Sequence, residues 1–103
     1  MSKRYFKLHT QLRSGAEVAY ERVHQEMSLE VKDALRRAGF NKWLIFRDGR
    51  DLFHIVECTD YPGALKRFFD DPVGRRWQEE MALLLEPNDE GSIRSPMSLV
   101  WEL

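Results

Sequence analysis

Two side chains that can transfer or orient a proton, Tyr20 and His24, lie four residues apart in a segment with helical periodicity. The stripe of that helix comprises Ala16, Tyr20, Val23, Met27, Val31 and Leu35, with His24 at its edge. Side chains at positions i and i+4 are neighbours on one helix face. A neutral imidazole carries one donor and one acceptor, so His24 could give a proton to an oxygen and take it back. The spacing leaves two interpretations open: acid–base chemistry, or a hydrogen-bonded core histidine.

Two tryptophans and two further histidines could also contribute to a site. Trp43 and Trp77 can pack in a core or form a wall against the apolar face of a sugar. His9 and His54 could join His24 in a metal site, because imidazole is a common metal ligand. However, no His-x-His or His-x-x-x-His spacing is present. We therefore expect no metal.

Composition restricts the class of protein. The 103 residues match the usual size of one domain, so residues 1–103 are interpreted as a single domain. The formal net charge is −1 and the basic residues are scattered, which argues against a nucleic-acid partner. Residues 1–7 lack the apolar run of a secretory signal, and no apolar segment is long enough to span a membrane. A cytoplasmic protein without a membrane partner is expected.

The first half of the chain predicts one strand and one long helix that together would position Tyr20 and His24. Residues 5–12 alternate between apolar and polar side chains, as in a half-buried strand. Ser14 and Glu17 have the spacing of a capping box, which predicts a helix from there to about Ala38, where Gly39 can end it. Ser28 is a possible interruption of this helix.

The second half predicts a hairpin, a broken helix and a last strand. Residues 43–47 and 52–58 have strand character, and Asp48-Gly49 between them is a hairpin signal. Asp60 with Pro62 marks a helix start, and Asp71-Pro72 marks a break in that helix. A polar, turn-rich segment at residues 86–91 then leads to a strand at residues 97–103.

The resulting βαββαβ order predicts an α+β fold, a ferredoxin-like sandwich in which helices cover one face of an antiparallel sheet. In such a sheet the first and third strands are neighbours. Apolar side chains fall on both faces of the strand at residues 43–47. The uncovered face therefore predicts a homodimer of the dimeric α+β barrel type.

Four segments resemble the L-rhamnose mutarotase family in order and separation: residues 20–24 (YERVH), Gly39 with residues 41–46 (NKWLIF), residues 52–57 (LFHIVE) and residues 73–77 (VGRRW). The resemblance spans nearly the whole chain. It implies a dimeric ferredoxin-like isomerase that interconverts the α and β anomers of a free aldose such as L-rhamnose or L-fucose, without cofactor or metal.

The resemblance also assigns roles to single residues. The family's proton-donating histidine corresponds to His24, and its substrate-contacting tyrosine corresponds to Tyr20. Trp43 corresponds to an aromatic substrate contact, and the family's tryptophan pair corresponds to Trp77 and Gln78. On this hypothesis His24 protonates the ring oxygen of the sugar. Tyr20, a second polar group or a water then handles the anomeric hydroxyl.

Other functions are compatible with the same architecture, because a fold alone assigns none. The alternatives are a cofactor-free monooxygenase or isomerase, and a non-catalytic dimer that binds a small ligand. Carboxylates or amides around His24 would favour a sugar, whereas an apolar pocket would favour the monooxygenase. The lack of any cavity beside His24 would favour the non-catalytic dimer.

Overall fold

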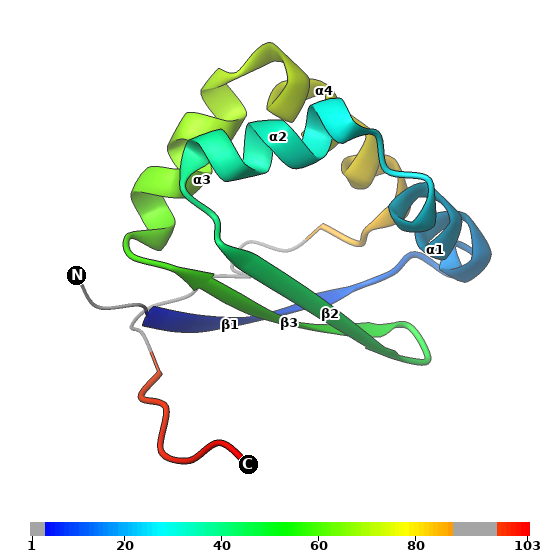
Figure 1. Ribbon diagram of the computed structural model, residues 1–103. Helices are drawn as coiled ribbons and strands as arrows, with labels where there is room; N and C mark the ends of the chain where they lie inside the picture. The colour runs from blue at the N-terminus through cyan, green and yellow to red at the C-terminus, as the bar shows by residue number, and fades with distance from the viewer. Residues whose placement is uncertain (1–3, 88–96) are drawn as a thin grey trace.

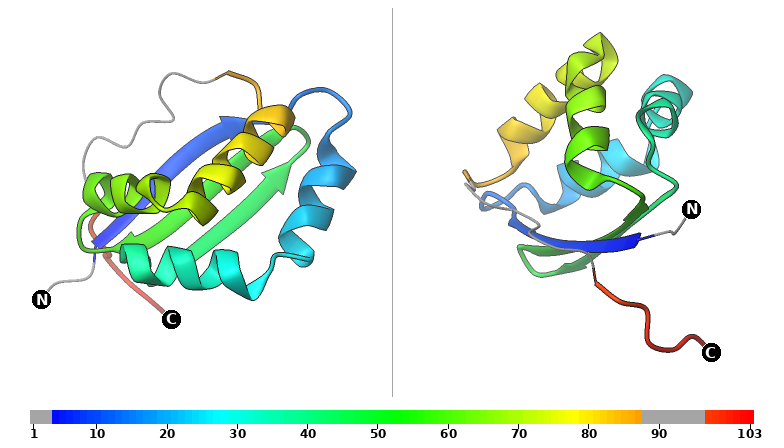
Figure 2. Two further views of the ribbon diagram at one scale, coloured as in Figure 1. Left: turned by 90° about the horizontal axis from the view of Figure 1, so that it is seen from above. Right: turned by 90° about the vertical axis from the view of Figure 1, so that its left-hand side faces the viewer.

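A sheet of three antiparallel strands, covered on one face by helices, forms the body of the molecule (Figure 1). The computed structural model describes residues 4–87 and 97–103. The strands are β1 (Arg4–Gln11), β2 (Lys42–Asp48) and β3 (Asp51–Cys58), in the order β1-β3-β2. The helices are α1 (Glu17–Gln25), α2 (Leu29–Ala38), α3 (Tyr61–Asp70) and α4 (Pro72–Leu84). Figure 2 shows all four helices over the same face of the sheet, as a ferredoxin-like sandwich requires.

The register of the sheet sets which side chains face the helices. His54, in the central strand β3, is opposite Leu8 of β1 and Ile45 of β2. Because side chains alternate along a strand, these three residues lie on the helix-covered face. The core residues Phe6 and Val56 are partners on the same face. The prediction that the first and third strands are neighbours is confirmed.

The long helix predicted for the first half is two helices. Ser28 is the N-cap of α2, where its hydroxyl accepts a hydrogen bond from the Val31 amide at 3.3 Å. Gly39 ends α2 with a φ of 114°, a backbone conformation that glycine adopts without a steric penalty. The interruption expected at Ser28 is therefore confirmed, and so is the end at Gly39.

The predicted capping box at the start of this helix is wrong. The first helix begins at Glu17, its N-cap is Ala16, and no side chain caps it. The Ala16 amide donates instead to the Arg13 carbonyl at 3.1 Å. This bond closes a tight turn between β1 and α1, and Ser14 is part of that turn rather than of the helix.

The hairpin and the broken second helix are confirmed. Gly49 has a φ of 64° in the turn between β2 and β3. The Asp60 carboxylate accepts from the Gly63 amide at the start of α3, and the Asp71 carboxylate accepts from the Val73 amide at the start of α4. Each helix therefore has its own aspartate cap, with a proline in its first turn.

The predicted strand at residues 97–103 is wrong. Its only pairing within the described part of the chain is one bridge, in which the Met97 amide donates to the Tyr5 carbonyl at 2.7 Å. The following residues leave the edge of β1 and extend to the side of the sheet opposite the helices (Figure 2). Trp101 is 72% exposed there. Of the predicted turn at residues 86–91, residues 88–91 lie outside the described residues.

No helix in residues 4–87 and 97–103 is long and apolar enough to cross a membrane.

The core has two parts under the helices. The larger part lies beneath α2, α3 and α4, around Phe6, Phe40 and Phe68. The smaller part lies beneath α1 and contains Leu12, Tyr20 and Leu52. The candidate site is built on this smaller part.

Candidate active site

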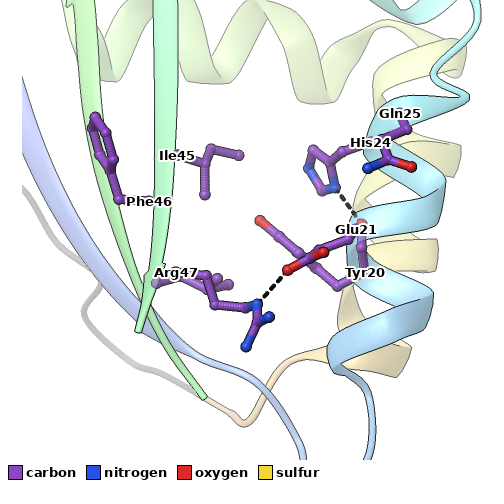
Figure 3. Close-up of a pocket in the computed structure, with 8 residues that line it drawn as sticks. Tyr20, Glu21, His24, Gln25, Ile45, Phe46 and Arg47 are labelled. Atoms are coloured by element: carbon purple, nitrogen blue, oxygen red, sulfur yellow. Dashed lines mark hydrogen bonds and ion pairs between the residues drawn. The ribbon is translucent and has the colours of Figure 1, made fainter. Parts of the chain in front are cut away.

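A cavity of about 440 Å³ lies between α1 and the hairpin of β2 and β3 (Figure 3). The residues that line it are Tyr20, Glu21, His24 and Gln25 from α1, Ile45, Phe46 and Arg47 from β2, and Leu52 from β3. The volume is within the range of sites for small molecules. Polar groups project mainly from α1, whereas Ile45 and Leu52 supply apolar surface from the sheet. The cavity can therefore hold a ligand with both a polar and an apolar side.

The imidazole of His24 extends from α1 into this space (Figure 3). Its Nδ1 lies 2.8 Å from the Tyr20 carbonyl oxygen. A carbonyl only accepts hydrogen bonds, so Nδ1 carries a proton and donates it. Burial lowers the pKa of His24, and the bond to the Tyr20 carbonyl partly opposes this effect. At neutral pH the ring is therefore uncharged, and its Nε2 lone pair, which no described residue hydrogen-bonds, can accept a proton.

Two aromatic rings contact the ring of His24. Its centroid lies 4.2 Å from that of Tyr20 and 5.2 Å from that of Trp77, whose ring meets it edge-on at 81°. Tyr20 is one helical turn earlier on α1, and Trp77 comes from α4. These contacts restrict rotation of the imidazole, so its Nε2 has a defined direction.

The phenol of Tyr20 is buried at the cavity. The side chain is only 5% exposed, and no residue in the described part of the chain hydrogen-bonds its oxygen. Burial raises the pKa of Tyr20 well above its ordinary value of 10.0, so the hydroxyl keeps its proton. An unpaired buried hydroxyl is unfavourable. A polar ligand in the cavity would supply the missing partner.

Trp43 is held away from the cavity wall by a hydrogen bond. Its indole Nε1 donates to Nδ1 of His54 at 3.0 Å, and its ring packs edge-on against Phe40. Because Nδ1 of His54 accepts, Nε2 carries the proton and donates to the Thr10 hydroxyl at 3.0 Å. Both ring nitrogens of this buried histidine are thus paired.

The three histidines do not converge. His9 lies on the opposite face of the sheet, where its ring stacks on Phe53 and its Nε2 is 3.0 Å from the Asp51 carboxylate. His24 and His54 are on the helix-covered face. No group of three or more His, Cys, Asp or Glu side chains that could hold a metal occurs within residues 4–87 and 97–103.

The rings of Tyr20, His24 and Trp77 lie together, but only Tyr20 and His24 of the expected site residues line the cavity, and Trp77 does not. Trp43 is absent from the cavity lining, although it lies on the same sheet face as Ile45, which lines it. Gln78 is exposed on α4 and does not line the cavity.

Sequence reasoning missed three polar lining residues, Glu21, Gln25 and Arg47. Glu21 directly follows Tyr20 in the sequence, and Gln25 directly follows His24. The position of Tyr20 and His24 on the helix could therefore have indicated that Glu21 and Gln25 lie near the site. Arg47 continues the inward alternation of Trp43 and Ile45, which was a second signal.

The buried His54 leads to a prediction about acid stability. Burial, followed by repulsion from His24 and His9, lowers the pKa of His54 from 6.5 to about 4. Between these pH values the unfolded chain binds a proton that the folded chain does not, so stability is lost as the pH falls. Acidification from pH 7 to pH 5 should lower the free energy of unfolding by about 2 kcal/mol.

Urea denaturation at both pH values measures this loss. His54→Gln, which cannot titrate, is the control and should show a markedly smaller difference between the two pH values. An equal difference in both proteins would assign the acid sensitivity to other groups.

The chain is similar over nearly its whole length to proteins of one family. A profile of the L-rhamnose mutarotase family matches residues 5–103. An L-rhamnose mutarotase from Acidiphilium cryptum is 33% identical over 95 residues, which cover 90% of this chain and 91% of the relative. One from Burkholderia cenocepacia is 32% identical over 88 residues, covering 84% of this chain and 82% of the relative.

Solved structures show the same fold. A crystal structure of an L-rhamnose mutarotase from Formosa agariphila superimposes with a TM-score of 0.66 at 23% identity, covering 100% of this chain and 99% of that one. A dimeric ferredoxin-like protein from an uncultured marine organism gives 0.59 at 12% identity, covering 100% and 92%. The match over nearly the whole chain, together with two relatives above 30% identity, shows that the chain belongs to the L-rhamnose mutarotase family.

Proposed function

We propose that the chain interconverts the α and β anomers of L-rhamnose or a closely related aldose, with His24 as the proton-transfer group. The observation that carries the proposal is the Nε2 of a neutral His24 at the cavity, beside the hydroxyl of Tyr20, with neither atom hydrogen-bonded by a residue in 4–87 or 97–103. The carboxylate of Glu21 and the amide of Gln25 line the same cavity. Such groups favour a polyhydroxyl ligand over the apolar substrate of a cofactor-free monooxygenase.

The chemistry needs only one movable proton. In a pyranose the ring oxygen and the anomeric hydroxyl are bonded to the same carbon, so one imidazole nitrogen can reach both. Nε2 of His24 takes the proton of the anomeric hydroxyl as the bond from C1 to the ring oxygen breaks. It then gives that proton to the former ring oxygen, which leaves an open-chain aldehyde. Rotation about the C1–C2 bond and reversal of these steps produces the other anomer.

The remaining residues bind and orient the sugar. Tyr20 stays protonated, so it donates a hydrogen bond to a sugar oxygen rather than acting as a base. Trp77 is not among the residues that line the cavity, but it contacts the His24 ring edge-on, and we keep it as a proposed apolar contact at the reacting end. We keep Trp43 and Gln78 as proposed contacts at the edge of the site, since Trp43 shares the inward face of Ile45 and Gln78 follows Trp77.

The pH dependence of the reaction follows from the state of His24. The base form of the imidazole is required, and burial lowers the pKa of His24 below its ordinary value of 6.5. We therefore expect kcat/KM to be constant at neutral pH and to fall as the pH drops, with the midpoint below pH 6.5. Exchange rates from pH 4 to pH 8, corrected for the rate in buffer, measure this profile. A corrected rate that increases steadily toward acid would contradict the assignment.

A panel of aldoses distinguishes this function from its alternatives. Anomer exchange is measured by NMR for L-rhamnose, L-fucose and lyxose, with and without the protein. The proposal predicts acceleration for L-rhamnose and smaller or no effects for the others. A non-catalytic binding protein would shift sugar resonances without acceleration, and a monooxygenase would do neither.

We further propose that a second copy of this single domain covers the open face of the sheet. Leu44, Phe46 and Phe53 on that face are 44%, 58% and 46% exposed. The C-terminal segment, residues 97–103, extends on the same side of the sheet (Figure 2), and it contains the exposed Trp101. Contiguous apolar surface of this kind is typical of protein interfaces. Sedimentation equilibrium should give the mass of a dimer, and Phe46→Glu should shift it toward the monomer.

We also propose a cytoplasmic location. Cys58 is buried in the core and forms no disulfide in the described part of the chain. A fold that depends on no disulfide bond is compatible with a reducing compartment. Detection of the tagged protein in the cytoplasmic fraction of its host would agree with this proposal, and detection in an extracytoplasmic fraction would contradict it.

A further inference from the structure

An ion pair lines the cavity at the end away from His24. The Arg47 Nε donates to the Glu21 carboxylate at 2.5 Å, and thereby joins β2 to α1. Figure 3 shows the two side chains meeting across the space between the strand and the helix, while the imidazole lies further along α1. A ligand that touches His24 at one end would therefore meet the pair at the other.

The pair leaves one acceptor and one donor group available to a ligand. The Arg47 Nη1 donates to the Gly49 carbonyl at 2.8 Å, and Nε is used by Oε2 of Glu21. No residue in the described ranges hydrogen-bonds Arg47 Nη2 or Glu21 Oε1. A carboxylate oxygen and a guanidinium nitrogen of one ion pair can bind two neighbouring hydroxyls, each of which both donates and accepts.

Stability does not account for this pair. The side chains are 34% and 47% exposed, and an ion pair as accessible as this contributes little to folding. The cavity also has no net charge, because the two charges cancel and His24 is neutral. The site therefore suits an uncharged ligand better than a sugar acid or a sugar phosphate.

We infer that Glu21 and Arg47 bind the C3 and C4 hydroxyls of the sugar and so determine its specificity. This inference rests on the proposed function, which places the bond between C1 and the ring oxygen at His24. In a pyranose ring the bond opposite that one is C3–C4. A sugar that presents its reacting bond to His24 therefore directs its C3 and C4 hydroxyls toward the ion pair.

Two variants and two sugars test the inference. Glu21→Gln and Arg47→Leu are each assayed with L-rhamnose and with 4-deoxy-L-rhamnose, which lacks the C4 hydroxyl. With L-rhamnose both variants should raise KM about tenfold, the effect of a lost hydrogen bond to a charged group, with less than about a twofold change in kcat. With the deoxy sugar at least one variant should change KM less than about twofold. Lys66→Met, which breaks the exposed pair with Asp70 on α3, is the control and should leave KM unchanged.

The outcomes separate the inference from the proposed function. If the pair only ties α1 to β2, the variants will raise KM equally for both sugars, and the inference is wrong while the function stands. If the intact protein binds L-rhamnose without accelerating anomer exchange, the proposed function is wrong. Dissociation constants of the two variants for the two sugars then test the inference in place of KM. If the intact protein binds neither sugar, both the proposed function and the inference are wrong.

Discussion

His24→Ala is expected to reduce kcat for the anomer exchange of L-rhamnose by about 10²-fold or more, toward the rate in buffer. The variant removes the only ring nitrogen at the cavity whose lone pair has no partner in the described part of the chain. Tyr20 cannot replace it, because its raised pKa keeps the phenol protonated. KM should change much less than kcat, since Tyr20, Glu21 and Arg47 remain.

Saturation-transfer NMR measures this effect, and two controls make the result specific. His9→Ala removes an imidazole on the opposite face of the sheet and should retain full activity. Thermal unfolding of His24→Ala shows whether the fold survives, which is expected because the side chain is only partly buried. A folded His24→Ala variant with the exchange rate of the intact protein would remove His24 from the mechanism.

Gly74→Ala should lower the free energy of unfolding by about 3 kcal/mol, the largest stability effect expected here. Gly74 is buried in the first turn of α4. A Cβ at this position would overlap the carbonyl oxygen of Phe68 in α3. The obstacle is backbone, so no side-chain rotation relieves it and the junction of the two helices must open.

The same change should also affect the site, because α4 carries Trp77 against the His24 ring. Urea denaturation measures the stability, and the exchange assay at low temperature measures the activity of the folded fraction. Arg75→Ala, at the next and exposed position, is the matched control and should change stability by less than about 0.5 kcal/mol. A Gly74→Ala protein as stable as this control would mean that α3 and α4 can separate at little cost.

The parts of the fold that depend on local chemistry could be predicted from the sequence. Ser28, Asp60 and Asp71 cap helices through their own side chains, and Gly39 ends a helix through its own φ. Each of these signals acts within three residues. Ser14 is a serine like Ser28, but the helix cap predicted from it is wrong. The turn after β1 makes Ala16 the N-cap of α1 instead.

Features that join distant parts of the chain could not be predicted in this way. The strand expected at residues 97–103 would have to pair with the edge of β1. In the described residues this pairing is limited to the bridge between Tyr5 and Met97. Helical spacing placed Tyr20 and His24 on one face, but not the bond to the Tyr20 carbonyl that fixes the tautomer. Glu21 and Arg47 are 26 residues apart in the sequence. Their ion pair depends on the packing of α1 against β2, which local sequence signals do not predict.

The central claim is that this chain catalyses anomer exchange, and saturation transfer on L-rhamnose tests it most directly. The resonance of the α anomeric proton is irradiated while the intensity of the β resonance is followed. The exchange rate is expected to increase in proportion to the concentration of the intact protein. A rate equal to that in buffer at every protein concentration would contradict it.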